Sequence, residues 1–412
     1  MTGPRPGRPT GPPRLLLVYV GALITADLAF GTALTPLLPR YAHLAGLSEP
    51  TAGILMGAYA LGGIIGAVPG GVVAGRLGSR TAAQLGLAAA GAAGLVLGWS
   101  SSAGALTGAR FVQGAAGACT WAAGLAWLSG ATPTARRGEV LGTAMGFAAA
   151  GAVAGPAAGA LAIWAGPGPA FTAAAAACAA LIIAAWFLPA PQERGPRILL
   201  PGLRFLGDRG MSAGMLLTAL GGMGAGGLDV LAPLRLSRLG ATTAVLAGTW
   251  IAAGVLEMAL SSRIGRISDR LGETAAVRLL LTAAAITLLA FPLLGASWWL
   301  AALLSAGLPA FGCLCVPGAA LLCGGADRQR LHAAVAFGLG NLAWSGGQAV
   351  AAMAAGAAAQ ATADAVPTAT LAGLCLLVSA AVPRGPRRPP EPAQAAAEDA
   401  SPARHPGGRA WP

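Results

Sequence analysis

Four ionisable residues lie inside long apolar runs of this 412-residue sequence: Asp27, Arg110, Asp229 and Glu257. A charged group at the centre of a bilayer costs about 2.5–3.5 kcal/mol on insertion scales. Such residues are rare, and each marks a functional site whose partner must be found. Buried carboxylates in these places are typical of proton-carrying groups, and a buried arginine is a natural counter-charge.

Asp27 and Arg110 are predicted to lie at similar depths. Asp27 follows the start of its run at Leu15 by twelve residues, and Arg110 follows Ala103 by seven. In helices these steps amount to about 18 Å and about 10 Å, measured from opposite faces of a membrane core about 30 Å thick. The two depths nearly coincide.

Asp229 and Glu257 each allow two interpretations. Asp229 follows a glycine cluster, which predicts either a flexible or broken helix beside a cavity, or simple close packing. Glu257 faces the same cavity or pairs with Arg263 in the following loop. In a later run, Asn341 offers hydrogen bonds to a cavity, although amides in membrane spans often serve helix packing instead.

Composition requires a membrane. Hydrophobic residues make up 56% of the chain and charged residues only 10%, so lipid must solvate many of its side chains. The net charge of +12 comes entirely from arginine, and the absence of lysine excludes a Walker A phosphate loop and Schiff-base chemistry. The cysteines and histidines lack metal-ligand spacing. We therefore expect no metal, no cofactor and no nucleic-acid partner.

Apolar runs of about 20 residues predict an all-α integral membrane protein with twelve transmembrane helices. The runs are 15–38, 51–74, 82–99, 103–128, 138–163, 169–188, 211–234, 243–262, 275–294, 298–322, 332–355 and 368–382. If both termini are cytoplasmic, only Arg40, Arg235 and Arg238 fall in outer loops, as the positive-inside rule requires. This places the chain as a multi-pass protein of the inner (plasma) membrane.

The two halves of the chain are related by duplication. A shift of 194 residues aligns Pro39 with Pro233, Gly46 with Gly240, and the tripeptide at 76–78 with that at 270–272. We predict a disordered N-terminus (1–14), a six-helix bundle (15–189), a linker (190–210), a second bundle (211–382) and a disordered tail (383–412). Such repeats are common in secondary transporters, with the substrate site between the halves.

At these residues the chain resembles the major facilitator superfamily, whose signature loop reads Gly, spacers, Asp-Arg, a spacer and Gly. The second copy matches it at Gly265, Asp269, Arg270 and Gly272, whereas the first copy, with Gly71, Arg76 and Gly78, has Gly75 where the family has Asp. The resemblance implies a latch on the inner side. By pseudosymmetry we expect Asp269 near 136–139, at the start of the fifth helix.

Two further motifs extend the resemblance. The run from Arg110 through Gln113 to Gly114 is similar to a family motif whose buried arginine is implicated in proton coupling. The fifth run is similar to the motif of drug:proton antiporters, at positions Gly142, Gly151, Gly155, Pro156 and Gly159, and departs from it at Ala160. The spacing of four residues lines up the last three glycines on one helix face, which predicts a hinge, a sealed interface or ordinary close packing.

These features favour a proton-coupled exporter of a hydrophobic or amphipathic small molecule, acting as a monomer. In the resembled family the first and fourth helices both line the cavity, so we expect Asp27 to pair with Arg110, to take up a proton and then to release Arg110. A static ion pair is the alternative. An importer of a small nutrient is the second function, and a membrane enzyme or receptor is disfavoured because the sequence offers no catalytic constellation.

Overall fold

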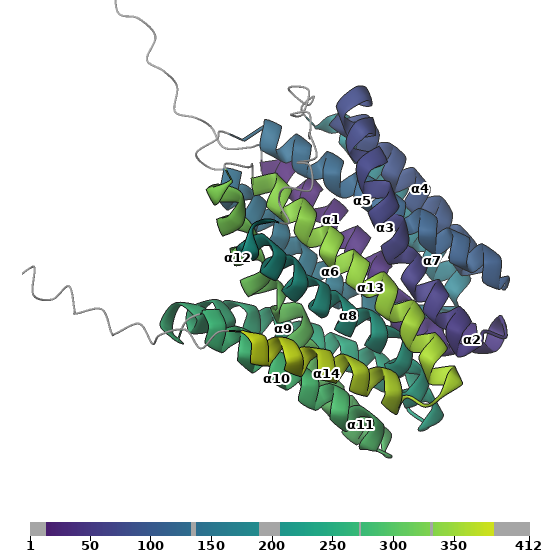
Figure 1. Cartoon of the computed structure of the whole chain (residues 1–412). Coiled ribbons are helices and arrows are strands. Elements are labelled where there is room, and N and C mark those ends of the chain that lie inside the picture. Colours follow the sequence, from purple (N-terminus) through teal and green to yellow (C-terminus); the bar gives the residue numbers. More distant parts are fainter. Residues whose placement is uncertain (1–13, 133–136, 189–206, 272, 330–332, 383–412) are drawn as a thin grey trace, which may run out of the picture.

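The computed structural model describes residues 14–132, 137–188, 207–271, 273–329 and 333–382, in which every regular element is a helix (Figure 1). Of the first half, residues 14–188, the helices are α1 (Arg14–Ala33), η1 (Thr35–Leu37), α2 (Leu38–Leu44), α3 (Glu49–Leu77), α4 (Ser79–Trp99), α5 (Ala103–Gly130), α6 (Arg137–Ala165), α7 (Pro167–Ala184) and η3 (Ala185–Phe187). Of the second half, residues 207–382, they are α8 (Arg209–Arg238), α9 (Thr243–Leu271), α10 (Glu273–Ala290), η5 (Phe291–Leu293), α11 (Ser297–Cys313), α12 (Cys315–Arg328), α13 (Ala333–Ala361) and α14 (Ala365–Ala381).

The fold is that of an all-helical integral membrane protein. In the described residues, eight helical stretches are long and apolar enough to cross a membrane, and two shorter apolar helices accompany them. Large apolar side chains also point outward, with Trp164 95% exposed and Phe187 83% exposed. Exposure of such groups to lipid costs no free energy, whereas their exposure to water is unfavourable. The helices coincide with the twelve predicted runs, but the number of spans stays a prediction.

Each half surrounds its own buried core. One cluster takes its members from Leu16 to Leu188, with Val230 and Ala352 joining from the second half. The other runs from Leu217 to Cys375. The two cores are separated along the sequence between α7 and α8, where the linker 190–210 is predicted. Residues 189–206 lie outside the described part, as do 1–13 and 383–412, so these boundaries stay predictions.

The duplication is visible in the backbone. Gly46 and Gly240, which the 194-residue shift aligns, both have positive φ angles, of 60° and 75°. The turns are closed alike: the amide of Leu47 donates to the carbonyl of Ala42 at 2.9 Å, and that of Ala241 donates to Leu236 at 2.9 Å. Glycine suits this left-handed conformation because it has no Cβ. The same turn therefore follows α2 in the first half and α8 in the second.

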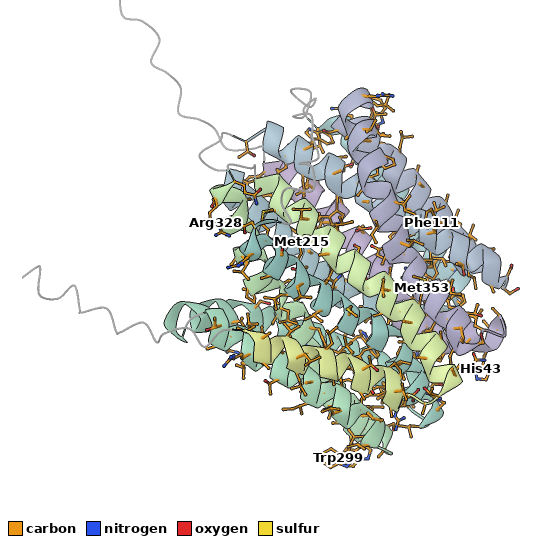
Figure 2. All side chains as sticks on the ribbon, viewed as in Figure 1. His43, Phe111, Met215, Trp299, Arg328 and Met353 are labelled. Atoms are coloured by element: carbon orange, nitrogen blue, oxygen red, sulfur yellow. The ribbon has the colours of Figure 1, made fainter. Side chains whose placement is uncertain are left out.

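Two ends of the molecule can be distinguished. The terminal end is where α1 begins and α14 finishes, and the distal end carries the turns at Gly46 and Gly240. Arg328 lies at the terminal end, whereas His43 and Trp299 lie at the other (Figure 2). The halves meet toward the distal end, where Gly53 and Gly57 of α3 pack against Ala349, Ala352 and Met353 of α13.

Close contact between α3 and α5 sets the geometry of the first half. A Cβ added at Gly62 would collide with the carbonyl oxygen of Phe111, and one added at Gly114 would collide with that of Tyr59. Small residues let helix backbones approach in this way within lipid. Because the obstacles are backbone atoms, side-chain rearrangement cannot relieve such a collision.

We expect Gly114→Ala to destabilise the folded protein by about 1–3 kcal/mol, as overpacking of a tight interface does. The matched control is Gly108→Ala in the same helix, where an added Cβ meets no atom within 4 Å. Thermal melting in detergent should separate the two variants clearly. Equal melting temperatures would contradict the packing described for α3 and α5.

Candidate functional site

Asp27 lies on α1 with its carboxylate held by two neutral donors. The indole Nε1 of Trp121 donates to Oδ2 at 2.7 Å, and the hydroxyl of Tyr59 donates to Oδ1 at 3.2 Å. Gly117 of α5 leaves the space that Oδ1 occupies, because a Cβ there would overlap it. The carboxylate is thus held by two neighbouring helices, α3 and α5, and has no cation among its hydrogen-bond partners in the described part of the chain.

Arg110 is fully enclosed, at 1% exposure, on α5. Its Nη1 donates to Oε1 of Gln113 at 2.7 Å and to the carbonyl of Phe30 at 3.3 Å, and Nη2 donates to the carbonyl of Gly31 at 3.1 Å. Its Nε has no hydrogen-bond partner. Carbonyl and amide oxygens therefore hold this cation.

The predicted direct pair of Asp27 with Arg110 is wrong for this structure. No ion pair joins their described side chains, and Tyr59 connects them instead. Its hydroxyl binds Asp27 while its ring lies beneath the guanidinium, 4.6 Å from Cζ to the ring centroid. A cation over an aromatic face is favourable. The expected release of Arg110 by a proton on Asp27 therefore has no direct bond to break.

One face of α5 builds most of this site. Arg110, Gln113, Gly117 and Trp121 follow one another at spacings of three, four and four residues, which keep side chains on one side of a helix. Arg110 and Gln113 were predicted as site residues from the sequence, whereas Trp121 and Tyr59 were not. The signal was present, because Trp121 continues the polar face three turns beyond Arg110.

The acid of the second half also lies in the site. The indole Nε1 of Trp250 on α9 donates to Oδ1 of Asp229 at 2.9 Å. Asp229 and Arg110 are close enough to interact electrostatically. This interaction therefore joins an acid of one half to the arginine of the other, and the assignment of Asp229 to a cavity between the halves stays a prediction.

The glycine cluster before Asp229 serves close packing. Gly222 and Gly226 lie against the backbone of α13 at Trp344 and Gln348, and Gly224 lies against the ring of Phe311. Helix α8 is continuous from Arg209 to Arg238. Of the predicted alternatives, a broken helix is wrong and close packing is confirmed, because the glycines accommodate neighbouring helices without interrupting their own.

Asp27, Tyr59, Arg110, Gln113 and Trp121 form the Asp27 cluster. Glu257 and Asn341 have no described contact with it. The carboxylate of Glu257 lies directly against Gly312 of α11, where a Cβ would overlap it. It receives no hydrogen bond from the described residues, and Arg263, the alternative partner, forms no ion pair with it. Asn341 is exposed on α13. These two assignments stay predictions.

The glycines of the antiporter-like motif pack against α1. Gly151 lies against Thr25 and Leu28, with an added Cβ 2.6 Å from the carbonyl oxygen of Thr25, and Gly155 and Gly159 continue this contact toward Ala33. Helix α6 runs unbroken through Pro156. The arrangement is a close interface between α1 and α6, so the motif supports the helix that carries Asp27.

The signature-loop residues are described only in part. In the first copy Gly71 is helical, Arg76 is exposed in the last turn of α3, and Gly78 ends that helix with a φ of 86°. In the second copy Gly265, Asp269 and Arg270 belong to the last turns of α9. Their side chains, Gly272 and the predicted contact near 136–139 lie outside the described part and stay predictions.

Comparison with known proteins decides the family. The family model described as Major Facilitator Superfamily matches residues 19–352. The chain belongs to the Major Facilitator Superfamily. It is accordingly a membrane transporter and not an enzyme. No group of three or more His, Cys, Asp or Glu side chains that could hold a metal occurs in the described residues.

Solved structures share this fold at low sequence identity. The nucleoside transporter NupG aligns with a TM-score of 0.72 and 13% identity, over 89% of this chain and 98% of that one. A D-xylose-proton symporter aligns with a TM-score of 0.68 and 16% identity, over 91% and 98%. A bacterial homolog of the human lysosomal transporter Spinster has a TM-score of 0.63 and 13% identity, over 90% and 98%. No curated protein matches by sequence.

Tyr59 offers a direct test of this site. Tyr59→Phe removes the donor to Asp27 but keeps the ring beneath Arg110, so we expect a loss of about 1.5–3 kcal/mol, as for hydrogen bonds to charged groups. Tyr59→Leu should cost more because the cation–π contact is lost as well. Melting curves of both variants measure the order. If Leu were as stable as Phe, the ring contact with Arg110 would carry no weight.

Proposed function

We propose that the protein is a proton-coupled secondary transporter that exports a hydrophobic or amphipathic small molecule by alternating access. The proton gradient supplies the energy, without a bound cofactor. The chain works as a monomer with twelve spans in the inner (plasma) membrane, both termini being cytoplasmic. The observation that carries the proposal is the carboxylate of Asp27, whose hydrogen-bond donors among the described residues are the neutral side chains of Trp121 and Tyr59.

Neutral donors make Asp27 suitable for proton exchange. A carboxylate in an ion pair would leave a buried cation unpaired when protonated, which is costly. Arg110 already has carbonyl and amide partners, so a proton on Asp27 leaves it satisfied. Beside Asp27 lies a cavity of about 10 Å³ whose lining is mostly apolar, with Asp27 and Thr120 as its polar members. That volume is close to the minimum that holds one water molecule.

Protonation would change the aromatic neighbours of Asp27. A proton on Oδ1 can be donated to Tyr59, whose hydroxyl then turns from donor to acceptor. A proton on Oδ2 would face the indole N–H of Trp121, which cannot accept a hydrogen bond, and would displace it. In both cases the altered side chain is an aromatic one at the proposed substrate cavity. Proton binding and the shape of the cavity are thereby coupled through the two residues that hold the carboxylate.

The surroundings favour an apolar substrate. Tyr59, Trp121 and Trp250 present aromatic surface around the acids, and most polar groups of the site are bonded to one another, with Arg110 Nε and Gln113 Nε2 as the exceptions among its described atoms. Sites of this composition suit hydrophobic ligands positioned by a small number of polar contacts. Sugars and highly charged metabolites would need more free donors and acceptors.

Export is favoured over import by the interface of α6 with α1. The glycines at 151, 155 and 159 that form it resemble the drug:proton antiporter motif. Import of a small nutrient with protons is the second function, since a D-xylose-proton symporter is among the proteins of the same fold. The two directions differ in how transport responds to an imposed pH gradient.

A compound screen followed by transport in proteoliposomes tests the proposal. Cells that carry the protein should resist or expel certain compounds. Under an imposed pH gradient, the purified protein should then move these compounds in the direction opposite to the flow of protons. We expect Asp27→Asn to lose gradient-driven movement but to retain exchange of substrate without a gradient, because asparagine keeps the hydrogen-bonding shape without the charge. Asp229→Asn is the matched control, a second acid with one indole donor.

Full proton-driven transport by Asp27→Asn would contradict the proposal. Movement of the compounds in the same direction as the protons would establish import instead. Loss of gradient-driven transport in Asp229→Asn, with Asp27→Asn unaffected, would transfer the proton site to the second half.

A further inference from the structure

We propose that four residues at the distal end, Glu49, Arg235, Arg238 and Asp364, form an electrostatic latch that sets how readily the two halves separate there. The inference rests on the chain being a transporter whose halves move apart. It does not depend on protons, on the substrate or on the direction of transport, and none of the four residues belongs to the Asp27 cluster.

Asp364 anchors the latch within the second half. It lies in the turn between α13 and α14 with its side chain only 7% exposed, and the two arginines at the end of α8, Arg235 and Arg238, bind it. Arg235 Nη1 donates to Oδ2 at 3.0 Å, and Arg238 Nη2 donates to Oδ1 at 3.0 Å and to Oδ2 at 2.8 Å. Two cations therefore surround one acid.

Arg235 cannot reach beyond its own half. Its second terminal nitrogen donates to the carbonyls of Pro292 at 2.8 Å and of Leu294 at 3.3 Å, and its guanidinium lies 5.4 Å from the ring of Phe291. Asp364 and Arg235 thus neutralise each other in a fixed position. The charge of Arg238 remains available for another acid.

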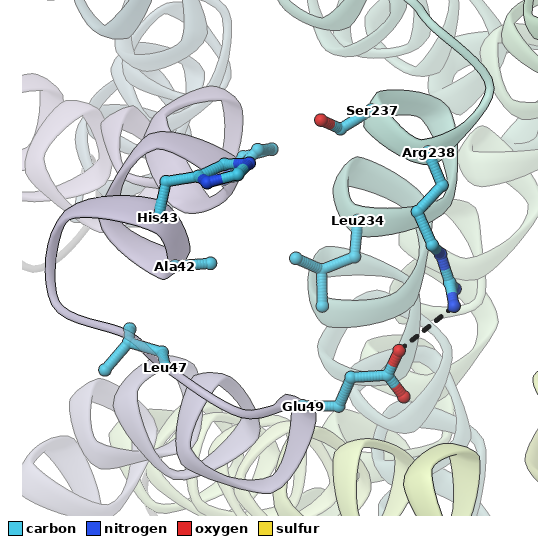
Figure 3. Close-up of a pocket in the computed structure, with 8 residues that line it drawn as sticks. Ala42, His43, Leu47, Glu49, Leu234, Ser237 and Arg238 are labelled. Carbon is cyan, nitrogen blue, oxygen red and sulfur yellow. Dashed lines mark hydrogen bonds and ion pairs between the residues drawn. The ribbon is translucent and has the colours of Figure 1, made fainter.

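Arg238 bridges the two halves. Its Nη2 holds Asp364 of the second half, and its Nη1 donates to Oε1 of Glu49 in the first turn of α3 at 3.1 Å. Figure 3 shows this contact crossing from α8 to the first half. When the halves part, Asp364 keeps both arginines and only the bond to Glu49 breaks.

The seam beside the latch is not filled by side chains. A pocket of about 140 Å³ lies between the halves, lined by α2 at Ala42 and His43 and by α8 at Leu234 and Ser237 (Figure 3). This part of the seam, between α2 and α8, is incompletely filled, whereas α3 and α13 pack closely beside it, with Gly356 against the backbone of Glu49. The Glu49–Arg238 bond is the polar connection across it, with Arg238 53% and Glu49 25% exposed.

The position of the latch also follows the internal repeat. Arg238 and Leu44 correspond under the 194-residue shift, as do Arg235 and Tyr41. The second half thus places arginines at the end of α8, where the first half has an apolar and an aromatic residue at the end of α2. Both ends are followed by the same glycine turn, at Gly46 and Gly240. The positive charge of Arg238 therefore has no counterpart at the corresponding position of the first half, and Glu49 binds it.

The test measures the distance between the halves directly. Spin labels at exposed positions Leu44 and Ala244, one in each half at the distal end, are introduced in the full chain with its six native cysteines replaced by alanine. We expect Glu49→Gln to raise the population with the distal end open by about twofold to fivefold, as for an exposed ion pair. Arg238→Gln should do the same, and the double variant should add nothing further.

Salt and a matched variant separate the latch from other effects. Raising the salt to about 1 M should reproduce the effect of Glu49→Gln in the unmodified latch and leave Glu49→Gln itself unchanged, because exposed charges are screened. Ser48→Ala removes the cap of α3, where Ser48 Oγ accepts from the amide of Thr51 at 3.4 Å, but keeps the charge of Glu49. It should leave the distances as they are.

Two results would overturn the latch. One is an unchanged distance distribution in both Glu49→Gln and Arg238→Gln, and the other is an equal opening in Ser48→Ala, which would assign the effect to the start of α3. Since the distances are measured without substrate or gradient, failure of the proton-coupled mechanism would leave this outcome untouched.

Discussion

Close approach of helix backbones is the constraint on which the rest of this structure depends. In lipid, apolar side chains gain nothing by leaving the solvent, so helices associate through small residues and close packing. Glycines of α3 and α5 bring these helices together at Tyr59 and Phe111, and glycines of α6 bring it against α1. Trp121 and Tyr59 meet at Asp27 only because these backbones are so near.

The same constraint explains how charges are tolerated inside the bundle. Arg110 uses carbonyls of α1 that lie within reach, and Asp27 fits in the space left by Gly117. Each charge is thus satisfied by dipoles and neutral donors from neighbouring helices. The carboxylate of Asp27, held in this way, can gain or lose a proton without leaving an oppositely charged partner unpaired, whereas a carboxylate in a buried ion pair cannot.

Much of this organisation was predictable from the sequence. Apolar runs and the 194-residue repeat led to the helices and to the matching turns at Gly46 and Gly240, because hydrophobic length and glycine conformation are local properties. Equal depths of Asp27 and Arg110 indicated a common site. Depth alone does not determine the angle about each helix axis, so the intervening ring of Tyr59 was missed.

Other errors have the same origin. The sequence left the glycines before Asp229 open to a flexible or broken helix or to close packing, because their role depends on α11 and α13, which are distant in sequence. The link between Glu49 and Arg238 joins residues 189 positions apart and could not be inferred from either alone. Sequence patterns describe one helix at a time, whereas these contacts arise from how helices are placed against each other.

The central claim is that Asp27 exchanges a proton against substrate while Trp121 and Tyr59 hold its charged form. Proton release measured in weakly buffered detergent solution tests this most directly, using a compound that the protein transports. We expect binding to release about one proton per protein molecule, and none from Asp27→Asn, because linkage requires ligand and proton to affect each other equally. Binding without any proton change, or with the same release from Asp27→Asn, would contradict the account.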